Sequence, residues 1–270
     1  MHTRSCNMKI ARIAFEEQTH YAIVDNEHFT FIQDDIFTAI TPTKETCSLE
    51  QATILPPVIP SKIIALAVNY ESHAKGHNME AFPIPEPFFK TPSSIIGHKD
   101  DVILPQNVGR VDAEAEVVVV IGKQASKITA EQVTDHIFGY TCGNDISARD
   151  WQKNDNQWWR AKSADTFAPI GPYITTGLDP NNINIIGRIN NKIIQESNTS
   201  HLIHSIEKSI SFISQFITLH PGDLIFTENV GASLAVIELD NGDIVVAGGS
   251  AFLDGGYGGN GTIKRLSFSE

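Results

Sequence analysis

The chain has 270 residues, of which 41% are hydrophobic and 19% charged, a composition typical of a globular protein with one large domain or one domain plus a small appendage. Twenty basic residues against thirty-two acidic ones give a formal net charge of −12. This balance argues against nucleic acid as the main partner, because phosphate binding needs a clustered positive surface. The longest apolar runs, such as Val117 to Ile121, are too short to span a bilayer, so no membrane segment is expected.

The cysteine pattern favours a reducing compartment. The three cysteines, Cys6, Cys47 and Cys142, are far apart and form no CxxC pair, which disfavours a disulfide framework or a zinc ribbon. The first residues also lack the apolar core of a signal peptide. We therefore predict a cytoplasmic protein.

Residues 8 to about 55 are expected to form a small β-structure. The alternation in residues 9–15 predicts a strand, and residues 21–24 face 29–32 across Asp25-Asn26, which predicts a hairpin. The Pro-rich stretch 55–60 then resembles a stiff linker. We predict a small N-terminal β domain with its linker at residues 1–58 and a catalytic domain at residues 59–270.

Strands and helices mix beyond this boundary. The predicted elements, in chain order, are buried strands at 62–68 and 116–121, a helix from the capping box of Thr129 and Gln132 to about His136, an amphipathic helix from Ser200 to Leu219, a strand at 224–227, and hairpin turns at Asn190-Asn191 and Asn241-Gly242. Strands outnumber helices without regular alternation, which predicts an α+β, mainly β fold.

Two glutamates form the strongest local feature for chemistry. Residues two apart in a strand point to the same side, so Glu114 and Glu116 would project together, and a hard divalent cation would relieve their repulsion. A solvated edge with alternating glutamates is an equally frequent pattern. The metal interpretation gains weight because Glu116 runs directly into a buried apolar strand, where an unpaired acid is costly.

Two further segments carry candidate site residues. Asp145 ends an apolar stretch and could add a third carboxylate, while Arg149 could bind a substrate carboxylate through two hydrogen bonds. The alternative for this segment is a capped turn with an internal ion pair. Lys162, next to Trp158-Trp159, could lie partly desolvated near an anion, although a surface lysine is the more frequent case.

The chain resembles the fumarylacetoacetate hydrolase family in a series of motifs over residues 8–226. The motifs that carry the resemblance are Asn69-Tyr70-x-x-His73, Phe89-Lys90-x-Pro92-Ser93, Asp112-x-Glu114-x-Glu116, Gly143 to Asp150 with Gln152, and Ala161-Lys162-Ser163. Five linked motifs in the same order are highly specific, whereas any one alone would be weak.

The resemblance implies a fold, an assembly and a set of site residues. It implies a mixed β-sandwich roll that forms a homodimer, with Glu114, Glu116 and Asp145 as ligands of Mg²⁺, or of Mn²⁺ or Ca²⁺ instead. Lys162 resembles the lysine that faces the developing negative charge of the substrate, and His73 resembles a lid histidine that helps to activate water. The resemblance further implies that four residues contact the substrate: Arg149, Gln152, Tyr70 and Thr227.

The expected substrate is a small acidic metabolite, a β-diketo or 2-oxo acid. Such an acid can chelate Mg²⁺ through its carboxylate and keto oxygens, and both the metal and Lys162 would stabilise an enolate. Hydrolysis of a C–C bond in an acylpyruvate or fumarylacetoacetate-like acid is the first expectation. Decarboxylation or isomerisation of an oxaloacetate-like or 2-hydroxydienoate acid is the alternative, because one scaffold supports all three reactions.

Three departures from the family pattern bear on this choice. Gly76 stands where hydrolytic relatives have a glutamate three positions after the lid histidine, which weakens the case for water activation. Thr227-Glu-Asn-Val230 replaces the usual Thr-Gly-Thr-Pro, so that a glutamate lies beside the pocket, where it would repel a dicarboxylate or serve as a new acid–base group. The end of the chain is unusually Gly-rich, and residues 256–261 match GxGxxG without room for the βαβ unit that a dinucleotide site needs.

Other classes of function have less support in the sequence. His73 and His77 could bind zinc from one helix face, but there is no HExxH motif, and Gly76 weakens a helix there. A serine hydrolase is disfavoured because the chain has no GxSxG elbow. A degenerate family member that binds metal and an acidic ligand without turnover is the main alternative to an enzyme.

Overall fold

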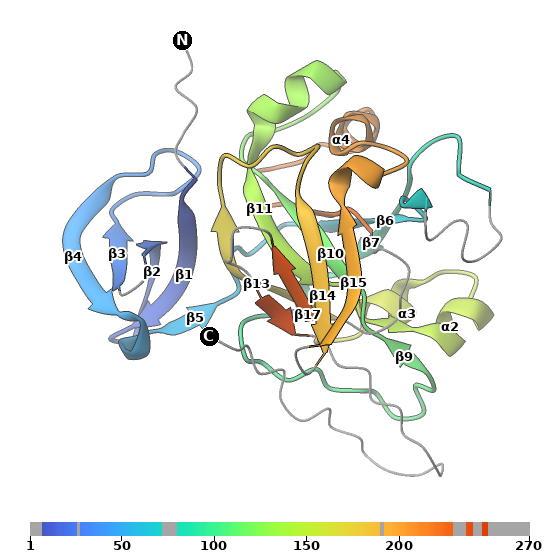
Figure 1. Ribbon diagram of the computed structural model, residues 1–270, viewed down its shortest axis with the longest axis horizontal. Coiled ribbons are helices and arrows are strands. Elements are labelled where there is room, and N and C mark those ends of the chain that lie inside the picture. Colours follow the sequence, from blue (N-terminus) through green and yellow to red (C-terminus); the bar gives the residue numbers. More distant parts are fainter. Residues whose placement is uncertain are drawn as a thin grey trace.

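The computed structural model of the protein describes residues 7–25, 28–71, 80–189, 192–228, 236–239 and 245–247. Strands predominate over helices in these ranges, and most strands belong to one large sheet (Figure 1). The predicted α+β, mainly β class is confirmed.

The large sheet has twelve strands. Its main path runs, in spatial order, through β4 (Pro42–Ser48), β3 (His28–Ile32), β2 (Gln18–Val24), β1 (Lys9–Phe15), β13 (Ala168–Thr175), β11 (Ile137–Asn144), β10 (Ala115–Ile121), β16 (Leu224–Phe226), β6 (Ile63–Ala67) and β7 (Glu86–Lys90). Off this path, β5 (Thr53–Leu55) pairs with β1 and β8 (Ile95–Ile96) pairs with β13.

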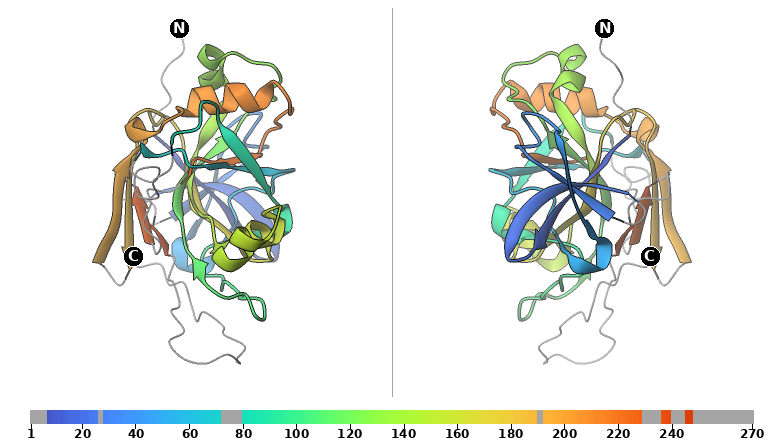
Figure 2. Two further views of the ribbon diagram at one scale, coloured as in Figure 1. Left: turned by 90° about the vertical axis from the view of Figure 1, so that its right-hand side faces the viewer. Right: turned by 90° about the vertical axis from the view of Figure 1, so that its left-hand side faces the viewer.

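Two smaller sheets and several short helices complete the described fold. One sheet pairs β9 (Val111–Asp112) with β12 (Ser147–Ala148), and the other has the order β15 (Lys192–Asn198), β14 (Asn184–Ile189), β17 (Val236–Leu239), β18 (Val245–Ala247). The α-helices are α2 (Arg149–Asn154), α3 (Trp159–Ser163) and α4 (Ile206–Ser214), and the 3₁₀-helices are η1 (Leu49–Gln51), η2 (Pro92–Ser94), η3 (Ala130–His136) and η4 (Thr199–His201). Figure 2 shows β14 and β15 as a layer at one side of the molecule, and α4 runs across the top of the molecule.

The N-terminal strands form a lobe that remains joined to the large sheet. The predicted hairpin is confirmed, because β2 and β3 pair antiparallel with Val24 opposite Phe29. β1 also pairs with β13, where Ile10 lies opposite Ile174. The lobe stands apart on the left of Figure 1, yet its strands continue the main sheet. The division into domains at residues 1–58 and 59–270 stays a prediction.

The strand β10 is buried on both faces, which explains its unbroken run of apolar residues. Val117 and Val119 pack into a core that includes residues of α4 and β14, whereas Val118 and Val120 pack into the core on the opposite face, with residues of β13 and β16. Each of these side chains is fully buried, which contributes about 1.5–3 kcal/mol apiece before entropy is counted. The centre of the sheet is therefore a rigid platform for whatever lies at its ends.

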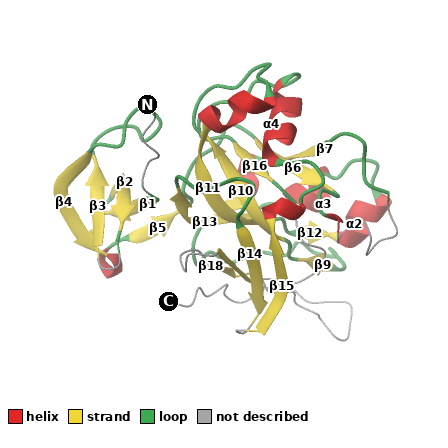
Figure 3. Ribbon diagram, turned by 45° about the horizontal axis from the view of Figure 1, so that its top comes forward, coloured by secondary structure: helices red, strands yellow, loops and turns green. Residues whose placement is uncertain are grey.

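The predicted helix over Ser200–Leu219 is wrong in its limits, because α4 covers only Ile206–Ser214 (Figure 3). Ser205 caps the helix by accepting a hydrogen bond from the N–H of Lys208. Just before it, the N–H of Ile203 donates to the carbonyl of Asn69 at 2.7 Å, so this residue bonds across the fold instead of within a helix. The apolar periodicity of isoleucines therefore extends beyond the helix that it predicted.

The remaining sequence predictions have mixed outcomes. The helix after Thr129 is present as η3, a 3₁₀-helix, with the side chain of Gln132 accepting from the N–H of Thr129. β14 pairs with β15 and β17 with β18 in antiparallel fashion, but the predicted turn residues between them lie outside the described residues. Among the described residues, no helix combines the length and apolar character needed to cross a membrane.

Asp223 ties the end of the Pro-rich linker to the start of β16. Its Oδ1 accepts hydrogen bonds from the backbone N–H and the hydroxyl of Ser61 and from the N–H of Lys62. Its Oδ2 accepts from the N–H of His220 at 2.7 Å and from Lys62 Nζ at 2.5 Å. Burial of this carboxyl raises its pKa, but the Lys62 ammonium and the other donors outweigh burial and lower the pKa below its usual value. The carboxylate thus fixes the parallel pairing of β16 with β6 at its first residues.

We expect Asp223→Asn to destabilise the fold by about 1.5–3 kcal/mol, because charge-assisted hydrogen bonds are lost. The lowered pKa means that this contribution is present above the unfolded-state pKa of about 3.9 and is lost as the pH falls through the folded-state pKa. Urea unfolding at pH 7 and pH 3 tests this. The gap between the native protein and the variant should shrink at the lower pH, and an unchanged gap would contradict the assignment.

Candidate metal and substrate site

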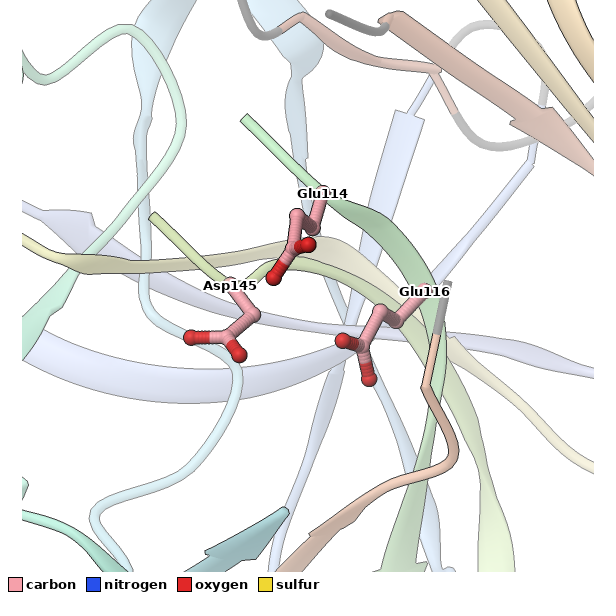
Figure 4. Close-up of side chains that lie close together, drawn as sticks. All are labelled: Glu114, Glu116 and Asp145. Carbon is pink, nitrogen blue, oxygen red and sulfur yellow. The ribbon is translucent and has the colours of Figure 1, made fainter. Parts of the chain in front are cut away.

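Three buried carboxylates converge at one end of the central strands. Glu114, Glu116 and Asp145 are each at most 3% exposed, and one ligand oxygen from each lies within 4.8 Å of the other two. Figure 4 shows the three carboxylates turned toward one another. The sequence-based expectation that Glu114 and Glu116 project to the same side matches this arrangement.

The backbone of β10 and β11 brings these residues together. The two strands pair antiparallel with Ala115 opposite Asn144, so Asp145 begins where the ladder ends. The two glutamates do not lie in one strand, as their spacing suggested, because β9 ends at Asp112 and β10 starts at Ala115. Glu114 lies in the break, where its N–H donates to the side chain of Asn144 and its carbonyl accepts from the N–H of Asp145, both at 2.8 Å.

Two buried lysines compensate the negative charge. Lys162 Nζ donates to Glu114 Oε2 at 2.7 Å, to Ser147 Oγ at 2.6 Å and also to Asp145. Lys90 Nζ donates to Asp145 Oδ1 at 2.6 Å and to the carbonyl of Lys162. The exposed fractions of Lys90 and Lys162 are 1% and 3%, so neither ammonium is solvated by bulk water.

The two glutamates respond to this environment in opposite directions. Burial alone would raise the pKa of Glu114, but Lys162 and Arg149 outweigh it and hold that pKa well below its usual value. Burial, together with the charges of Asp145 and Glu114, raises the pKa of Glu116 well above its usual value. Burial would lower the pKa of Lys162, yet Asp145 and Glu114 reverse that effect and raise it. Glu116 is therefore the glutamate of the cluster whose ionised form is least stabilised by its surroundings.

Arg149 joins the same network from the first turn of α2. Its Nε donates to Asp112 Oδ2 at 2.7 Å, one amino group donates to Glu114 and the other to Gln152 Oε1 at 2.8 Å. Asp112 also accepts two hydrogen bonds from Arg110, at 2.8 and 2.9 Å. Since a guanidinium carries five N–H groups, Arg149 keeps donors for an anionic ligand.

A cavity of about 370 Å³ opens over this network. Its lining residues are Leu66, Ala67, Val68, Phe88, Arg110, Asp112, Glu114, Glu116, Asp145, Arg149, Gln152, Trp158, Lys162 and Glu228. Six of the residues predicted from the sequence are in this list: the three carboxylates, Lys162, Arg149 and Gln152. Their roles as ligands stay predictions, but they share one wall of one cavity.

The other predicted residues lie elsewhere. Tyr70 is fully buried, and the cavity lining includes neither it nor Thr227. The hydroxyl of Thr227 donates to the carbonyl of Val117 at 2.9 Å, an interaction within the sheet. His73 lies outside the described residues, as do Gly76, His77 and the Gly-rich end of the chain.

Sequence reasoning missed several members of the network. Lys90 belongs to a quoted motif but received no role. The sequence alone gave no signal for it, because only the structure shows that in β7 Lys90 is buried while its neighbour Phe89 is 55% exposed. Ser147 and Asn144 also hold Glu114, and no local pattern distinguishes them from turn residues.

The donor set suits a hard divalent cation. Carboxylate oxygens are the preferred ligands of Mg²⁺, Mn²⁺ and Ca²⁺, whereas zinc sites favour nitrogen and sulfur. Three buried acids with converging ligand oxygens fit such an ion. The zinc alternative through His73 and His77 involves residues beyond those that the structure describes.

Comparison with family models gives two matches along the chain. A model described as "Fumarylacetoacetate (FAA) hydrolase C-terminal" matches residues 62–256. A model described as "Rv2993c-like, N-terminal" matches residues 8–57. The first match alone covers more than half of the chain and includes every residue of the cavity.

Individual proteins are similar over much of their length. An uncharacterized protein from Archaeoglobus fulgidus is 47% identical over 200 residues, which cover 73% of this chain and 78% of that protein. A protein from Rattus norvegicus named "Oxaloacetate tautomerase Fahd2a, mitochondrial" is 42% identical over 182 residues, covering 66% of this chain and 58% of that protein. A crystal structure of 5-carboxymethyl-2-hydroxymuconate delta-isomerase from Mycobacterium smegmatis superposes with a TM-score of 0.82 at 32% identity, covering 88% of this chain and 98% of that one.

We expect Glu116→Gln to weaken the binding of Mg²⁺ and Mn²⁺ at least about tenfold. Even substitutions of residues that only hydrogen-bond to a metal ligand typically lower metal affinity by about 10–100-fold. The amide has the same shape but lacks the charge. Isothermal titration of metal-stripped protein measures the effect. The matched control is Glu86→Gln, an exposed glutamate on β7, which should bind metal like the native protein. Equal affinities of the two variants would show that the three carboxylates are not a metal site.

Proposed function

The chain belongs to the fumarylacetoacetate hydrolase family, and on that premise we propose that it is a Mg²⁺-dependent isomerase of a small 2-oxo acid, such as an oxaloacetate-like acid. The reaction moves a proton between carbon and oxygen, which interconverts keto and enol forms. The observation that carries the proposal is the buried ammonium of Lys162 beside Glu114 and Asp145 in the cavity wall.

Lys162 supplies positive charge where the enolate oxygen would form. Its ammonium is 5.2 Å from the centre of the Phe88 ring, and the apolar side chains of Phe88 and Leu66 line the same cavity. Charge stabilisation is stronger in such a partly desolvated site than in water. A divalent cation held by the three carboxylates would add Lewis-acid polarisation of the keto oxygen.

Arg149 orients the substrate through its carboxylate. The bonds to Asp112 and Glu114 fix the guanidinium, so a substrate carboxylate meets donors that are already in place. Gln152 is bound to the same guanidinium and faces the same cavity. These residues hold one end of the acid while Lys162 meets the oxygen on the neighbouring carbon.

Two observations favour isomerisation over hydrolysis. A proton shift needs no activated water, and Gly76 stands where hydrolytic relatives have a glutamate three positions after the lid histidine. The names of the rat and Mycobacterium smegmatis proteins also refer to a tautomerase and an isomerase. Hydrolysis of an acylpyruvate-like acid, decarboxylation, a homodimer and a cytoplasmic location remain predictions.

Metal-stripped protein should be incubated with oxaloacetate and with acetylpyruvate, with and without Mg²⁺, while enol absorbance and products are followed. We expect Mg²⁺ to accelerate the change in enol absorbance of oxaloacetate, with the acid recovered intact. Release of two smaller products would indicate hydrolysis, and release of CO₂ would indicate decarboxylation. No acceleration of either substrate, despite metal binding, would favour the non-catalytic family member.

We expect Lys162→Met to lower kcat for this isomerisation by about 10²–10³-fold, because one preorganised charge donor at the developing oxyanion is lost. KM should change much less, since the carboxylate end is held by Arg149. The control is Lys153→Met, an exposed lysine on α2, which should keep its activity. A variant that folds by circular dichroism yet turns over like the native protein would remove Lys162 from the mechanism.

A further inference from the structure

The carboxylate of Glu228, another residue of the cavity lining, is bound by backbone N–H groups. Its Oε1 accepts from the N–H of Val68 at 2.7 Å, and its Oε2 accepts from the N–H of Tyr70 at 3.1 Å. Glu228 is only 5% exposed. One side chain from a distant part of the chain therefore accepts hydrogen bonds from a partly buried and a buried backbone N–H group.

The backbone of the same residue binds a candidate metal ligand. The N–H of Glu228 donates to Glu116 Oε2 at 2.7 Å. The preceding residue, Thr227, is fixed to the carbonyl of Val117 through its N–H at 3.1 Å and its hydroxyl at 2.9 Å. Glu228 therefore connects β10 to the segment after β6, and both elements contribute residues to the lining of the cavity.

Two residues of this connection have backbone conformations that the surrounding contacts must hold in place. Glu228 has a φ of +85° and Val68 a φ of +53°, a region that favours glycine and that a β-branched residue rarely adopts. Such conformations persist only where the surrounding contacts hold them. A residue with positive φ whose neighbouring N–H groups converge is also the geometry of a backbone anion cradle.

We propose that Glu228 is a positioning residue, whose carboxylate is the resident anion of a backbone cradle formed by the N–H groups of Val68 and Tyr70. By filling this cradle it fixes the cavity wall at Val68 relative to Glu116. The proposal rests on the proposed function only where it treats Glu116 as a metal ligand. The N–H groups of Val68 and Tyr70 are occupied in the native protein, so a substrate carboxylate cannot use them and would be bound by Arg149 instead.

The test is rescue of Glu228 variants by a free carboxylate. Glu228→Ala and Glu228→Gly vacate the cradle, and the melting temperature of metal-stripped protein should fall by about 5 °C. Glycine tolerates the positive φ, so the melting temperature of Glu228→Gly should fall less than that of Glu228→Ala. Excess sodium acetate, compared with sodium chloride at equal concentration, should recover about half of the loss by occupying the cradle.

Glu228→Gln is the matched control. Its amide fills the cradle but offers one acceptor oxygen against two N–H donors, so the variant should melt lower than the native protein and acetate should not restore it. The native protein should also be indifferent to acetate. In the alanine and glycine variants acetate should raise Mg²⁺ affinity and kcat together, a coupled rescue that a purely structural contact would not give.

The outcomes separate this proposal from the proposed function. Equal effects of acetate on the alanine, glutamine and native proteins would overturn the cradle, as would an alanine variant that melts like the native protein. Rescue of melting in metal-stripped protein needs neither metal nor turnover. If the native protein showed no isomerase activity while acetate still rescued Glu228→Ala and not Glu228→Gln, the cradle would stand and the proposed reaction would fail.

Discussion

The burial of three carboxylates at the end of a rigid sheet is the constraint on which the rest of the site depends. Each acid at the end of β10 or β11 is almost fully removed from water, where an uncompensated charge is unstable. The chain answers with cations from separate elements: Lys90 from β7, Lys162 from α3 and Arg149 from α2. These elements, far apart in the sequence, thus each place a cation against the buried acids.

The negative charges of the two glutamates are compensated to different extents. Lys162 and Arg149 both contact Glu114, whereas Glu116 accepts a hydrogen bond from the backbone N–H of Glu228 and forms no ion pair with a lysine or arginine of the described residues. This asymmetry explains why the pKa of Glu114 is lowered while that of Glu116 is raised. A divalent cation would complete the balance, because its positive charge favours the ionised form of Glu116.

The sequence predicted the acids of the site more readily than their partners. The spacing of Glu114 and Glu116 before an apolar run is a local signal, and linked motifs suggested Asp145, Arg149 and Lys162. The break between β9 and β10 was not predictable, because the side chain of Asn144 that bonds Glu114 comes from a strand thirty residues away. The shortened α4 has the same cause, since Asn69 competes for the backbone before it. Long-range hydrogen bonds override local periodicity in both cases.

Glu228 shows why a departure from a family pattern needs the structure for its interpretation. Read as a sequence, a glutamate beside the pocket suggested repulsion of a dicarboxylate or a new acid–base group. Both of its oxygens accept backbone hydrogen bonds, so its charge is already engaged. A carboxylate held in this way acts as a hydrogen-bond acceptor for the backbone, which is the positioning role proposed for it. Under the proposed function, Arg149 in the cavity lining is then the group that would bind the carboxylate of an acidic substrate.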